Sequence, residues 1–415
     1  MKAIIIGGGI VGLCSAYYLN RSGWEVTVID SGSLTDGCSH GNLGMIVPSH
    51  FVPLAAPGMI SKGIRWMFNP QSPFYIRPSF NPELFRWGYR FFKSASVSNV
   101  ERAALPLLQL HQYSQLLYKE LAKEKGFDFG LEQRGILMYY KTNKTGDEEA
   151  ELAEKAKHMG IDAAVLNASE VQELEPYTAL DIAGAVHYRC DAHLYPNALV
   201  SQLVAYLERA GVIIEKNTLV HQLIVSGKRI QHIETDKGKR IADVIVLSAG
   251  SWLGSLAKTA SLRIPVIPGK GYSFTGTGLE QGLEIPAILC EAKVAITPMN
   301  GFLRFGGTME IGAMNDRVNM NRVKGIVTSV ASYFPGMNLA LPDKKDVWFG
   351  YRPCSPDGLP YLGRSKRIHN LIVAGGHAMM GLSLGAASGK VVAQIANENS
   401  PDVDICLFQP ERFQV

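Results

Sequence analysis

The fold of this chain is indicated near its start, where residues 3–12 read Ala-Ile-Ile-Ile-Gly-Gly-Gly-Ile-Val-Gly. The apolar run 3–6 predicts a buried strand that the glycines end. Apolar residues then recur at helical spacing from Ile10 to Arg21. The β-branched stretch 25–29, Glu-Val-Thr-Val-Ile, predicts a second strand that closes on Asp30. The segment is therefore a predicted strand–helix–strand unit of an α/β fold.

The glycines after the first strand have a spacing suited to a phosphate group. Gly7, Gly9 and Gly12 fit the pattern G-x-G-x-x-G. In such a loop the first glycine permits a tight turn, the second lets the backbone approach a pyrophosphate, and the third lets helix and strand pack closely. Ile10 and Val11 open the helix, whose free N–H groups and positive dipole end favour an anion. The pattern predicts a Rossmann-like dinucleotide site.

An acidic residue, Asp30, stands at the end of the second predicted strand, and Ser31 follows it. A carboxylate at this position can accept hydrogen bonds from a ribose diol, and its charge disfavours the 2′-phosphate of NADP. We expect both residues to contact the dinucleotide. The motif alone does not choose between FAD and NAD.

The overall composition is that of a well-buried globular protein. Of the 415 residues, 47% are hydrophobic and 19% are charged, which excludes a disordered chain. This length predicts two domains or one large composite domain. A formal net charge of +4 without a long basic run gives no support for nucleic-acid binding.

The cysteines and apolar runs bear on compartment and metal content. The six cysteines are scattered without a C-x-x-C pair, which argues against a disulfide scaffold and against a zinc site. We expect no metal and a cytoplasmic location. The apolar start could be taken for a signal peptide, but its glycines would weaken such a helix, and it leads directly into the second strand. No other apolar run of about 18 residues occurs, so no transmembrane helix is expected.

Two later stretches repeat the pattern of a buried parallel strand followed by small residues. Residues 244–250 read Val-Ile-Val-Leu-Ser-Ala-Gly, and residues 371–377 read Leu-Ile-Val-Ala-Gly-Gly-His. The nucleotide fold is therefore visited at least three times. We expect a discontinuous FAD- or NAD-binding domain and an α+β substrate domain with a large mixed or antiparallel sheet. The first would comprise residues 1–45, 190–260 and 346–415, and the second residues 46–189 and 261–345.

Prolines and aromatic residues interleave between residues 48 and 92, a stretch that includes Trp66, Phe74, Phe85 and Phe92. A long irregular segment of this kind in a compact protein is usually functional or a covering element. A cover over the active site and an irregular piece of core are equally compatible with the pattern. A surface that touches a membrane is a third interpretation.

Three further segments, with the glycine loop, resemble the D-amino-acid oxidase-like family of flavoenzymes. Residues 37–45 read Gly-Cys-Ser-His-Gly-Asn-Leu-Gly-Met, and residues 370–381 read Asn-Leu-Ile-Val-Ala-Gly-Gly-His-Ala-Met-Met-Gly. Residues 350–363 read Gly-Tyr-Arg-Pro-Cys-Ser-Pro-Asp-Gly-Leu-Pro-Tyr-Leu-Gly. Within the family, these segments look most like the bacterial D-amino-acid dehydrogenases. The stretch 53–76 and the tail 410–413 resemble that group too, so the likeness spans nearly the whole chain.

The resemblance implies an extended FAD, with adenine towards Asp30 and the isoalloxazine in the domain cleft. Relatives usually carry Glu at the ribose position, and Asp30 should still reach. Thr218 to Val220 would pass the adenine. Relatives with covalent flavin have Cys where this chain has Gly350, so we expect non-covalent FAD. The residues expected to contact FAD are Gly7, Gly9, Ile10, Val11, Gly12, Asp30, Ser31, Ser39, His40, Asn42, Leu43, Gly44, Met45, Val220, Ala249, Gly250, Gly350, Gly376, His377, Met379, Met380 and Gly381.

At the substrate end, Arg352 matches the family's carboxylate-binding arginine. Its planar guanidinium offers a bidentate fork for a carboxylate, which we favour over a structural ion pair. Tyr272 could orient the substrate, or it could be an ordinary strand tyrosine. His377 could contact flavin or substrate, or be structural. For His50 a structural or surface role is the stronger interpretation.

These assignments predict oxidative deamination of D-amino acids by hydride transfer from Cα to flavin N5, yielding 2-oxo acids and ammonia. Oxidase relatives hold a lysine on a strand that we match to residues 303–309, and this chain has none there. We therefore expect a dehydrogenase that passes electrons to a quinone or another acceptor, with possible contact at the inner face of the cell membrane. The alternatives are a secondary-amine or imino-acid substrate (D-proline, D-hydroxyproline, sarcosine or glycine), an NAD-only dehydrogenase and a nucleotide-binding protein without turnover.

Overall fold

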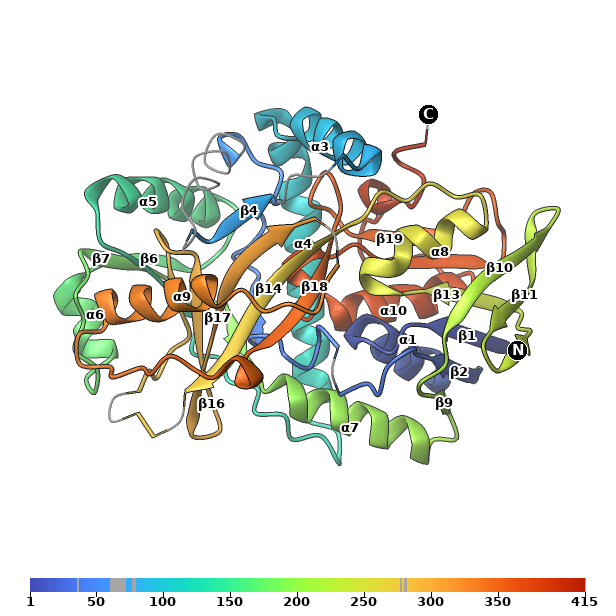
Figure 1. Cartoon of the computed structure of the whole chain (residues 1–415), viewed down its shortest axis with the longest axis horizontal. Helices are drawn as coiled ribbons and strands as arrows, with labels where there is room; N and C mark the ends of the chain where they lie inside the picture. The colour runs from blue at the N-terminus through green and yellow to red at the C-terminus, as the bar shows by residue number, and fades with distance from the viewer. Residues whose placement is uncertain are drawn as a thin grey trace.

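The computed structural model of the chain describes residues 1–35, 37–59, 72–76, 80–276, 278–279, 282–312 and 314–414. These residues form two large sheets, of six and nine strands, that lie next to each other (Figure 1). The expected architecture is confirmed: a parallel α/β unit stands beside a mixed sheet with helices.

The six-stranded sheet holds the glycine loop. Its order is β19-β20-β13-β1-β2-β9, and all neighbours are parallel except β19 and β20. Its strands are β1 (Lys2–Ile6), β2 (Glu25–Ile29), β9 (Ile213–Glu215), β13 (Val244–Leu247), β19 (Tyr361–Arg364) and β20 (Leu371–Gly375). The three expected visits to the nucleotide fold are therefore β1 with β2, then β13, then β20.

Both faces of this sheet are covered, which explains why its strands are continuously apolar. Ala3 and Ile5 pack with helices α1 (Ile10–Arg21) and α10 (Gly385–Ala396). Ile4 and Ile6 pack on the other side, with α8 (Leu253–Thr259) and the small sheet of β10 (Val220–Ser226), β11 (Arg229–Thr235) and β12 (Gly238–Arg240). Because side chains alternate along a strand, the apolar run 3–6 contributes side chains to the core on each face of the sheet.

A turn at residues 236–238 joins β11 to β12 in an antiparallel hairpin. The stretch 240–248 that follows is divided between two sheets. Its beginning belongs to β12, whereas residues 244–247 form β13 in the parallel sheet. The division follows from burial, because all four residues of β13 are buried between β1 and β20.

The nine-stranded sheet has the order β18-β14-β17-β16-β15-β5-β7-β6, and β4 pairs with β17. Its strands are β4 (Phe74–Ile76), β5 (Ile136–Tyr140), β6 (Ala163–Asn167), β7 (Gly184–Tyr188), β14 (Ile267–Gly276), β15 (Ala287–Leu289), β16 (Val294–Met299), β17 (Phe302–Ile311) and β18 (Trp348–Cys354). Helix α9 (Met320–Tyr333) packs on it. One of its strands, β18, comes from the stretch that the sequence assigned to the cofactor block.

The other α-helices within the described residues are α3 (Pro82–Ser94), α4 (Val97–Leu121), α5 (Asn143–His158), α6 (Ala168–Leu174) and α7 (Pro196–Arg209). Helix α4 runs near the middle of the molecule (Figure 1) and contributes to two cores, with Leu107 in one and Leu108 in the other. A short two-stranded sheet joins β3 (Met45–Ile46) to β8 (Ala192–His193). Within the described ranges, none of the helices combines the length and apolar character needed to span a bilayer.

Candidate active site

The glycine loop between β1 and α1 has the geometry that its spacing predicts. Gly7 adopts φ +107°, and a Cβ there would lie 2.4 Å from the Ser248 carbonyl oxygen. A Cβ on Gly12 would lie 1.9 Å from the Gly7 oxygen, so the packing of helix on strand excludes any side chain. Gly9 differs, because it is exposed and a Cβ there would meet only Ser39 Oγ, at 3.4 Å. The backbone at Gly9 can therefore be approached by a ligand.

The acidic residue at the end of β2 faces this loop. The Asp30 carboxylate accepts hydrogen bonds from the backbone N–H groups of Gly8, at 2.6 Å, and Gly32, at 2.7 Å. Each oxygen retains lone-pair capacity for a hydroxyl donor. Asp30 is half-buried, and Ser31 beside it is exposed. The carboxylate is held in place and can still accept hydrogen bonds from a diol.

The segment 37–45 runs from the glycine loop to the nine-stranded sheet. Ser39 Oγ accepts a hydrogen bond from the N–H of Ile10 at 2.8 Å, at the start of α1. The Gly41 carbonyl accepts one from Ser273 Oγ on β14 at 2.9 Å. Gly44, at φ +76°, leaves a hypothetical Cβ 2.1 Å from the Leu194 oxygen. The two sheets are thus joined through the segment predicted to follow the pyrophosphate and the flavin.

Arg304 on β17 hydrogen-bonds to the same segment, and it was not predicted from the sequence as a site residue. Its guanidinium is buried and donates to the carbonyls of Asn42, at 2.8 Å, and His40, at 3.3 Å, and to Asn197 Oδ1 at 3.0 Å. Burial lowers the pKa of Arg304. The sequence signal for Arg304 is a charged residue inside an otherwise apolar strand.

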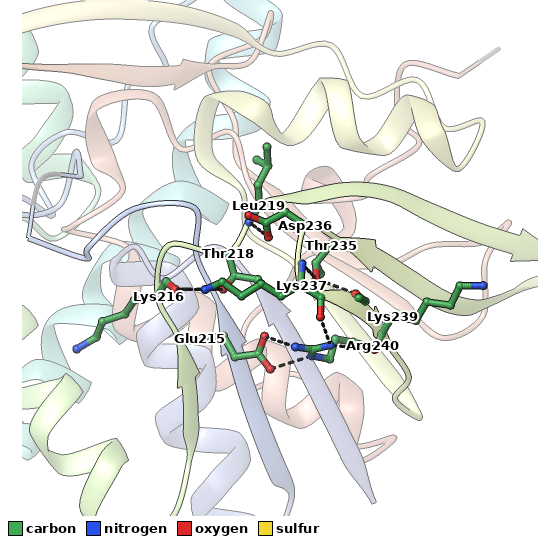
Figure 2. A network of polar contacts seen from close by, with 10 residues as sticks. Glu215, Lys216, Thr218, Leu219, Thr235, Asp236, Lys237, Lys239 and Arg240 are labelled. Carbon is green, nitrogen blue, oxygen red and sulfur yellow. Dashed lines mark hydrogen bonds and ion pairs between the residues drawn. The ribbon is translucent and has the colours of Figure 1, made fainter.

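The connection from β9 to β10 lies beside Asp30 and is held by a polar network (Figure 2). The N–H of Thr218 donates to the Asp30 carbonyl at 2.8 Å. Lys237 Nζ donates to Thr218 Oγ1 at 2.8 Å and to the Lys216 carbonyl at 3.1 Å. Arg240 forms a two-pronged pair with Glu215, at 2.9 and 3.1 Å. The network fixes the backbone next to the proposed ribose-binding carboxylate.

Two loops at the ends of β13 and β20 complete this edge. After β13, Ser248 Oγ contacts the carbonyls of Ile6 and Gly7, both at 3.1 Å, and Ala249 and Gly250 follow, with Gly250 at φ +53°. After β20, Gly376 adopts φ +74°. Because parallel strands end at one edge of a sheet, these loops lie near the glycine loop, where open α/β sheets bind their ligands.

His377 lies in the loop after β20 and is buried. Its Nε2 is 2.9 Å from Ser388 Oγ on α10. Burial lowers the pKa of His377 to about 4, so its imidazole is neutral at physiological pH. Met380 packs between two cores, whereas Met379 is 42% exposed. The hydrogen bond to Ser388 fixes the side chain of His377 against helix α10.

Arg352 lies on β18, at the junction of the two sheets. Its Nη1 donates to the Thr308 carbonyl at 2.6 Å, and a Cβ on Gly271 would lie 2.2 Å from the same nitrogen. Burial lowers the pKa of Arg352. Among the described residues no carboxylate lies within 4.0 Å of it. Arg352 is half-buried, and a partly desolvated cation without an acidic partner favours an anionic ligand.

The Thr308 carbonyl points at Arg352 because β17 is irregular there. Thr308 adopts φ +64°, and the register of β14 with β17 shifts between Lys270 and Tyr272. Such bulges re-aim groups beside functional sites, and positive φ is strained for a β-branched residue. The adjacent Gly306 and Gly307 are the sequence signal, because glycine inside a strand often marks a bulge.

Tyr272 does not lie beside Arg352, so its position favours the alternative of an ordinary strand tyrosine. It pairs in register with Phe349, and its ring is 1% exposed in the core beneath α9. Its hydroxyl accepts a hydrogen bond from the N–H of Asn319 at 3.2 Å. Because side chains alternate along a strand, Gly271 faces Arg352 and Tyr272 faces the opposite side. The alternative of a buried strand tyrosine is the one that the structure shows.

The described residues fit FAD at the edge that joins the two sheets. The approachable Gly9 backbone suits a pyrophosphate and the Asp30 carboxylate suits a ribose, while the segment 39–45 leads on towards Arg352. Within the described ranges, no group of three or more His, Cys, Asp or Glu side chains is arranged to hold a metal ion.

Comparisons with known proteins agree with this geometry. The model of the DAO family, described as FAD dependent oxidoreductase, matches residues 2–395. A D-amino acid dehydrogenase of Methylobacterium radiotolerans is 31% identical over 432 aligned positions, which cover 97% of each chain. One of Mesorhizobium japonicum, D-amino acid dehydrogenase 1, is 28% identical and covers all of both chains.

Solved structures share the fold. Glycine oxidase from Geobacillus kaustophilus has a TM-score of 0.77 at 22% identity and covers 99% of both chains. L-Proline dehydrogenase from P. horikoshii has a TM-score of 0.78 at 19% identity, over 100% of this chain and 97% of that one. The family match spans nearly the whole chain, and the site residues suit the cofactor: this protein belongs to the DAO family of FAD-dependent oxidoreductases.

Proposed function

We propose that the protein oxidises D-amino acids to imino acids, which hydrolyse to 2-oxo acids and ammonia. The observation that carries the proposal is the half-buried guanidinium of Arg352, which has no carboxylate within 4.0 Å among the described residues and lies beside the FAD edge. The α-carboxylate of an amino acid supplies the missing charge. The full-length likeness to D-amino acid dehydrogenases at about 30% identity supports the choice of substrate.

The protein's own residues bind and orient the substrate. The bond from Arg352 to the Thr308 carbonyl fixes one nitrogen of the guanidinium, and its remaining N–H groups can grip a carboxylate in two-pronged fashion. This fixes the direction of the Cα–H bond and prepares a geometry close to that of reaction. When bound, FAD accepts the hydride.

The experiment is an anaerobic titration of the flavin absorbance with a panel of D-amino acids, L-amino acids, glycine, sarcosine, D-proline and D-hydroxyproline. We expect bleaching by D-amino acids and little by their L-enantiomers. Bleaching by secondary amines alone would favour the second candidate, an imino-acid dehydrogenase, which the structural likeness to an L-proline dehydrogenase supports. Absence of bleaching by any amine would contradict both.

We infer that the flavin is held without a covalent bond, because Gly350 stands where covalent relatives have Cys. The nearest cysteine is Cys38, whose Sγ would lie 2.9 Å from a Cβ on Gly350. Burial raises the pKa of this thiol, which disfavours the reactive thiolate. Acid precipitation should therefore release all FAD into the supernatant. A yellow pellet that becomes colourless in Cys38→Ser would contradict the inference.

We propose a quinone rather than oxygen as the electron acceptor. Residues 303–309 contain no lysine, and the charged residue of that stretch, Arg304, is engaged with the backbone of the segment 37–45. The substrate-reduced enzyme should be reoxidised by a soluble quinone at least about 100-fold faster than by air-level oxygen. Comparable rates in stopped-flow mixing would assign an oxidase instead.

The outward face of α3 supports contact with a membrane that carries such a quinone. Leu84, Trp87 and Phe91 face the protein core, whereas Phe85, Tyr89 and Phe92 are 64%, 60% and 66% exposed. Arg86 and Lys93 on the same helix add positive charge. Exposed aromatic rings with flanking cations suit the headgroup region of an anionic bilayer. The protein should co-sediment with anionic vesicles, and a variant with Ser at positions 85, 89 and 92 should not.

A further inference from the structure

A hydrogen-bonded chain of three polar residues, His50, Ser49 and Asp191, joins the segment that follows β3 to the residue before β8. Ser49 donates from its N–H to Asp191 Oδ1 at 3.0 Å and from its hydroxyl to Asp191 Oδ2 at 2.5 Å. The Nδ1 atom of His50 lies 3.1 Å from the same hydroxyl oxygen. Because that hydroxyl donates to the carboxylate, His50 Nδ1–H donates to it, and Nε2 is left as an acceptor. The order of donors runs from His50 through Ser49 to Asp191.

Asp191, the carboxylate at the end of this hydrogen-bonded chain, lies in an unusual environment. Asp191 is fully buried, and no Lys, Arg or His of the described part of the protein lies within 4.0 Å of its oxygens. Its further side-chain contact is the thiol of Cys190, at 3.4 Å. An isolated buried carboxylate is costly, and the cost disappears when the group takes up a proton. The site is therefore suited to receiving one.

The segment that carries the chain lies against the loop predicted to touch the flavin ring. The N–H of Val47 donates to Ser383 Oγ at 2.9 Å, and Val47 and Phe51 pack in one core with Met380. Residues 45–52 therefore contact the region 380–383 directly. This places His50, which is half-buried, near the predicted isoalloxazine end of the site.

A second buried histidine at this place supports a polar ligand. His111 on α4 is fully buried, and its Nδ1 lies 2.9 Å from Ser383 Oγ. The same oxygen accepts the Val47 N–H. Nε2 is buried and has no hydrogen-bond partner among the described residues. Buried polar atoms are nearly always satisfied, so an unpartnered one indicates a missing water or ligand.

We propose that His50, Ser49 and Asp191 form a proton-accepting chain that deprotonates the α-ammonium group of the bound amino acid. The proposal rests on the proposed function, because it concerns the amine of the same substrate. Hydride leaves Cα readily only when the nitrogen lone pair is free to form the imine. The ammonium group must therefore lose a proton first.

The transfer balances without another reactant. His50 Nε2 takes the ammonium proton, the Nδ1 proton passes to Ser49 Oγ, and the Ser49 hydroxyl proton passes to Asp191 Oδ2. The substrate becomes a neutral amine, His50 and Ser49 end neutral, and the carboxylate becomes a carboxylic acid. No electron changes place in this step.

The surroundings of the chain set the direction of transfer. Burial raises the pKa of Asp191 to about 7, and the bonds from Ser49 offset part of that effect. Burial, with the nearby charge of Lys293, lowers the pKa of His50 to about 4, so His50 passes the proton on rather than storing it. The other titratable groups that face the chain are His111 from α4, and Tyr188 and Cys190 next to Asp191.

The first test measures the rate of anaerobic flavin reduction at saturating substrate as a function of pH. His50→Gln and Asp191→Asn should lower this rate about 100-fold near neutral pH, the usual contribution of a general base. The rates should converge with wild type above the pKa of the free substrate's ammonium group, where the amine is already neutral. The matched control is His158→Gln, an exposed histidine on α5, which should follow wild type at every pH.

A purely structural role would lower the rate of both variants equally at all pH values, and that result would overturn the proposal. So would an unchanged profile in His50→Gln with intact FAD absorbance. If wild type itself is reduced by no amino acid, the proposed function fails instead. The two failures are therefore distinguishable.

The second test needs no turnover. 2-Aminoisobutyrate has the carboxylate and the amine but lacks a Cα–H bond, so it binds without oxidation. Infrared difference spectroscopy of its binding to the FAD-loaded protein above pH 7 detects the carboxylic acid that forms when Asp191 takes the ammonium proton. We expect a new band of a protonated carboxyl group in wild type and none in Asp191→Asn. A wild-type difference spectrum without that band would overturn the proposal.

Discussion

At the scale of single residues, Arg352 connects the fold to the chemistry. Its guanidinium lies against Gly271 on the neighbouring strand β14, whose missing side chain makes room for it, and the Thr308 carbonyl fixes its orientation. Both features come from the sheet around it. A half-buried cation that is oriented and lacks an acid partner within the described residues is well suited to a carboxylate ligand.

Replacing Arg352 tests this assignment directly. Arg352→Leu should raise KM for the amino acid about 100-fold, since it removes one partner of a buried charge pair, while FAD stays bound. The KM of Arg352→Lys should lie between those of wild type and Arg352→Leu, because an ammonium group keeps the charge but lacks the planar fork. Steady-state kinetics with a dye acceptor measure both, and an unchanged KM in the Leu variant would remove Arg352 from the substrate site.

Asp191 also predicts a pH dependence of stability. Burial raises its pKa from 3.8 to about 7 in the folded protein, so the carboxylate penalises the native state increasingly as the pH rises from about 4 to 7. Asp191→Asn should therefore leave stability unchanged below pH 4 and increase it by roughly 2–4 kcal/mol above pH 7. Denaturant unfolding at several pH values measures the difference, and a variant that is less stable at pH 8 would contradict it.

At the scale of elements, the loop between β1 and α1 contains glycines with different purposes. Gly12 is required by the contact of the helix with its own loop, whereas Gly9 leaves its backbone open towards the ligand. The same six-residue motif thus combines a packing constraint with a binding surface.

The two glycines make a matched pair of variants. Gly12→Ala should destabilise the protein even without FAD, by about 2 kcal/mol or more, because its Cβ meets backbone. Gly9→Ala should leave the unfolding midpoint of the apoprotein within about 1 °C and weaken FAD binding at least tenfold. Thermal unfolding and fluorescence titration with FAD separate the effects. A Gly9 variant with normal affinity for FAD would show that the pyrophosphate does not approach there.

At the scale of the whole molecule, the cofactor site joins the two sheets. The segment 37–45 bonds to the loop of one sheet through Ser39 and to strands of the other through Gly41 and Asn42. A ligand along this segment contacts both sides and should stabilise the molecule as a unit. FAD at about 100 times its Kd should increase the stability by about 2.7 kcal/mol. Calorimetric scans with and without FAD measure this, and two separate unfolding transitions of which FAD shifts only one would contradict a site at the junction.

The local pattern of the sequence determined the strands β1, β2, β13 and β20, because continuous apolar runs followed by glycines reflect backbone limits that act over a few residues. It also determined the placement of Gly7, Gly9, Gly12 and Asp30, which depends on the same strand–helix–strand unit. The family resemblance pointed to Arg352, but the tertiary structure alone showed its lack of an acid partner. The tertiary structure likewise placed Tyr272 on the face of β14 away from Arg352. It brought Arg304 into hydrogen bonds with the segment 37–45, and it linked Asp191 to His50 through Ser49. These contacts join residues that lie up to some hundreds of positions apart in the sequence. Which side chains meet depends on strand register, because a shift of one residue moves every side chain of the strand to the opposite face.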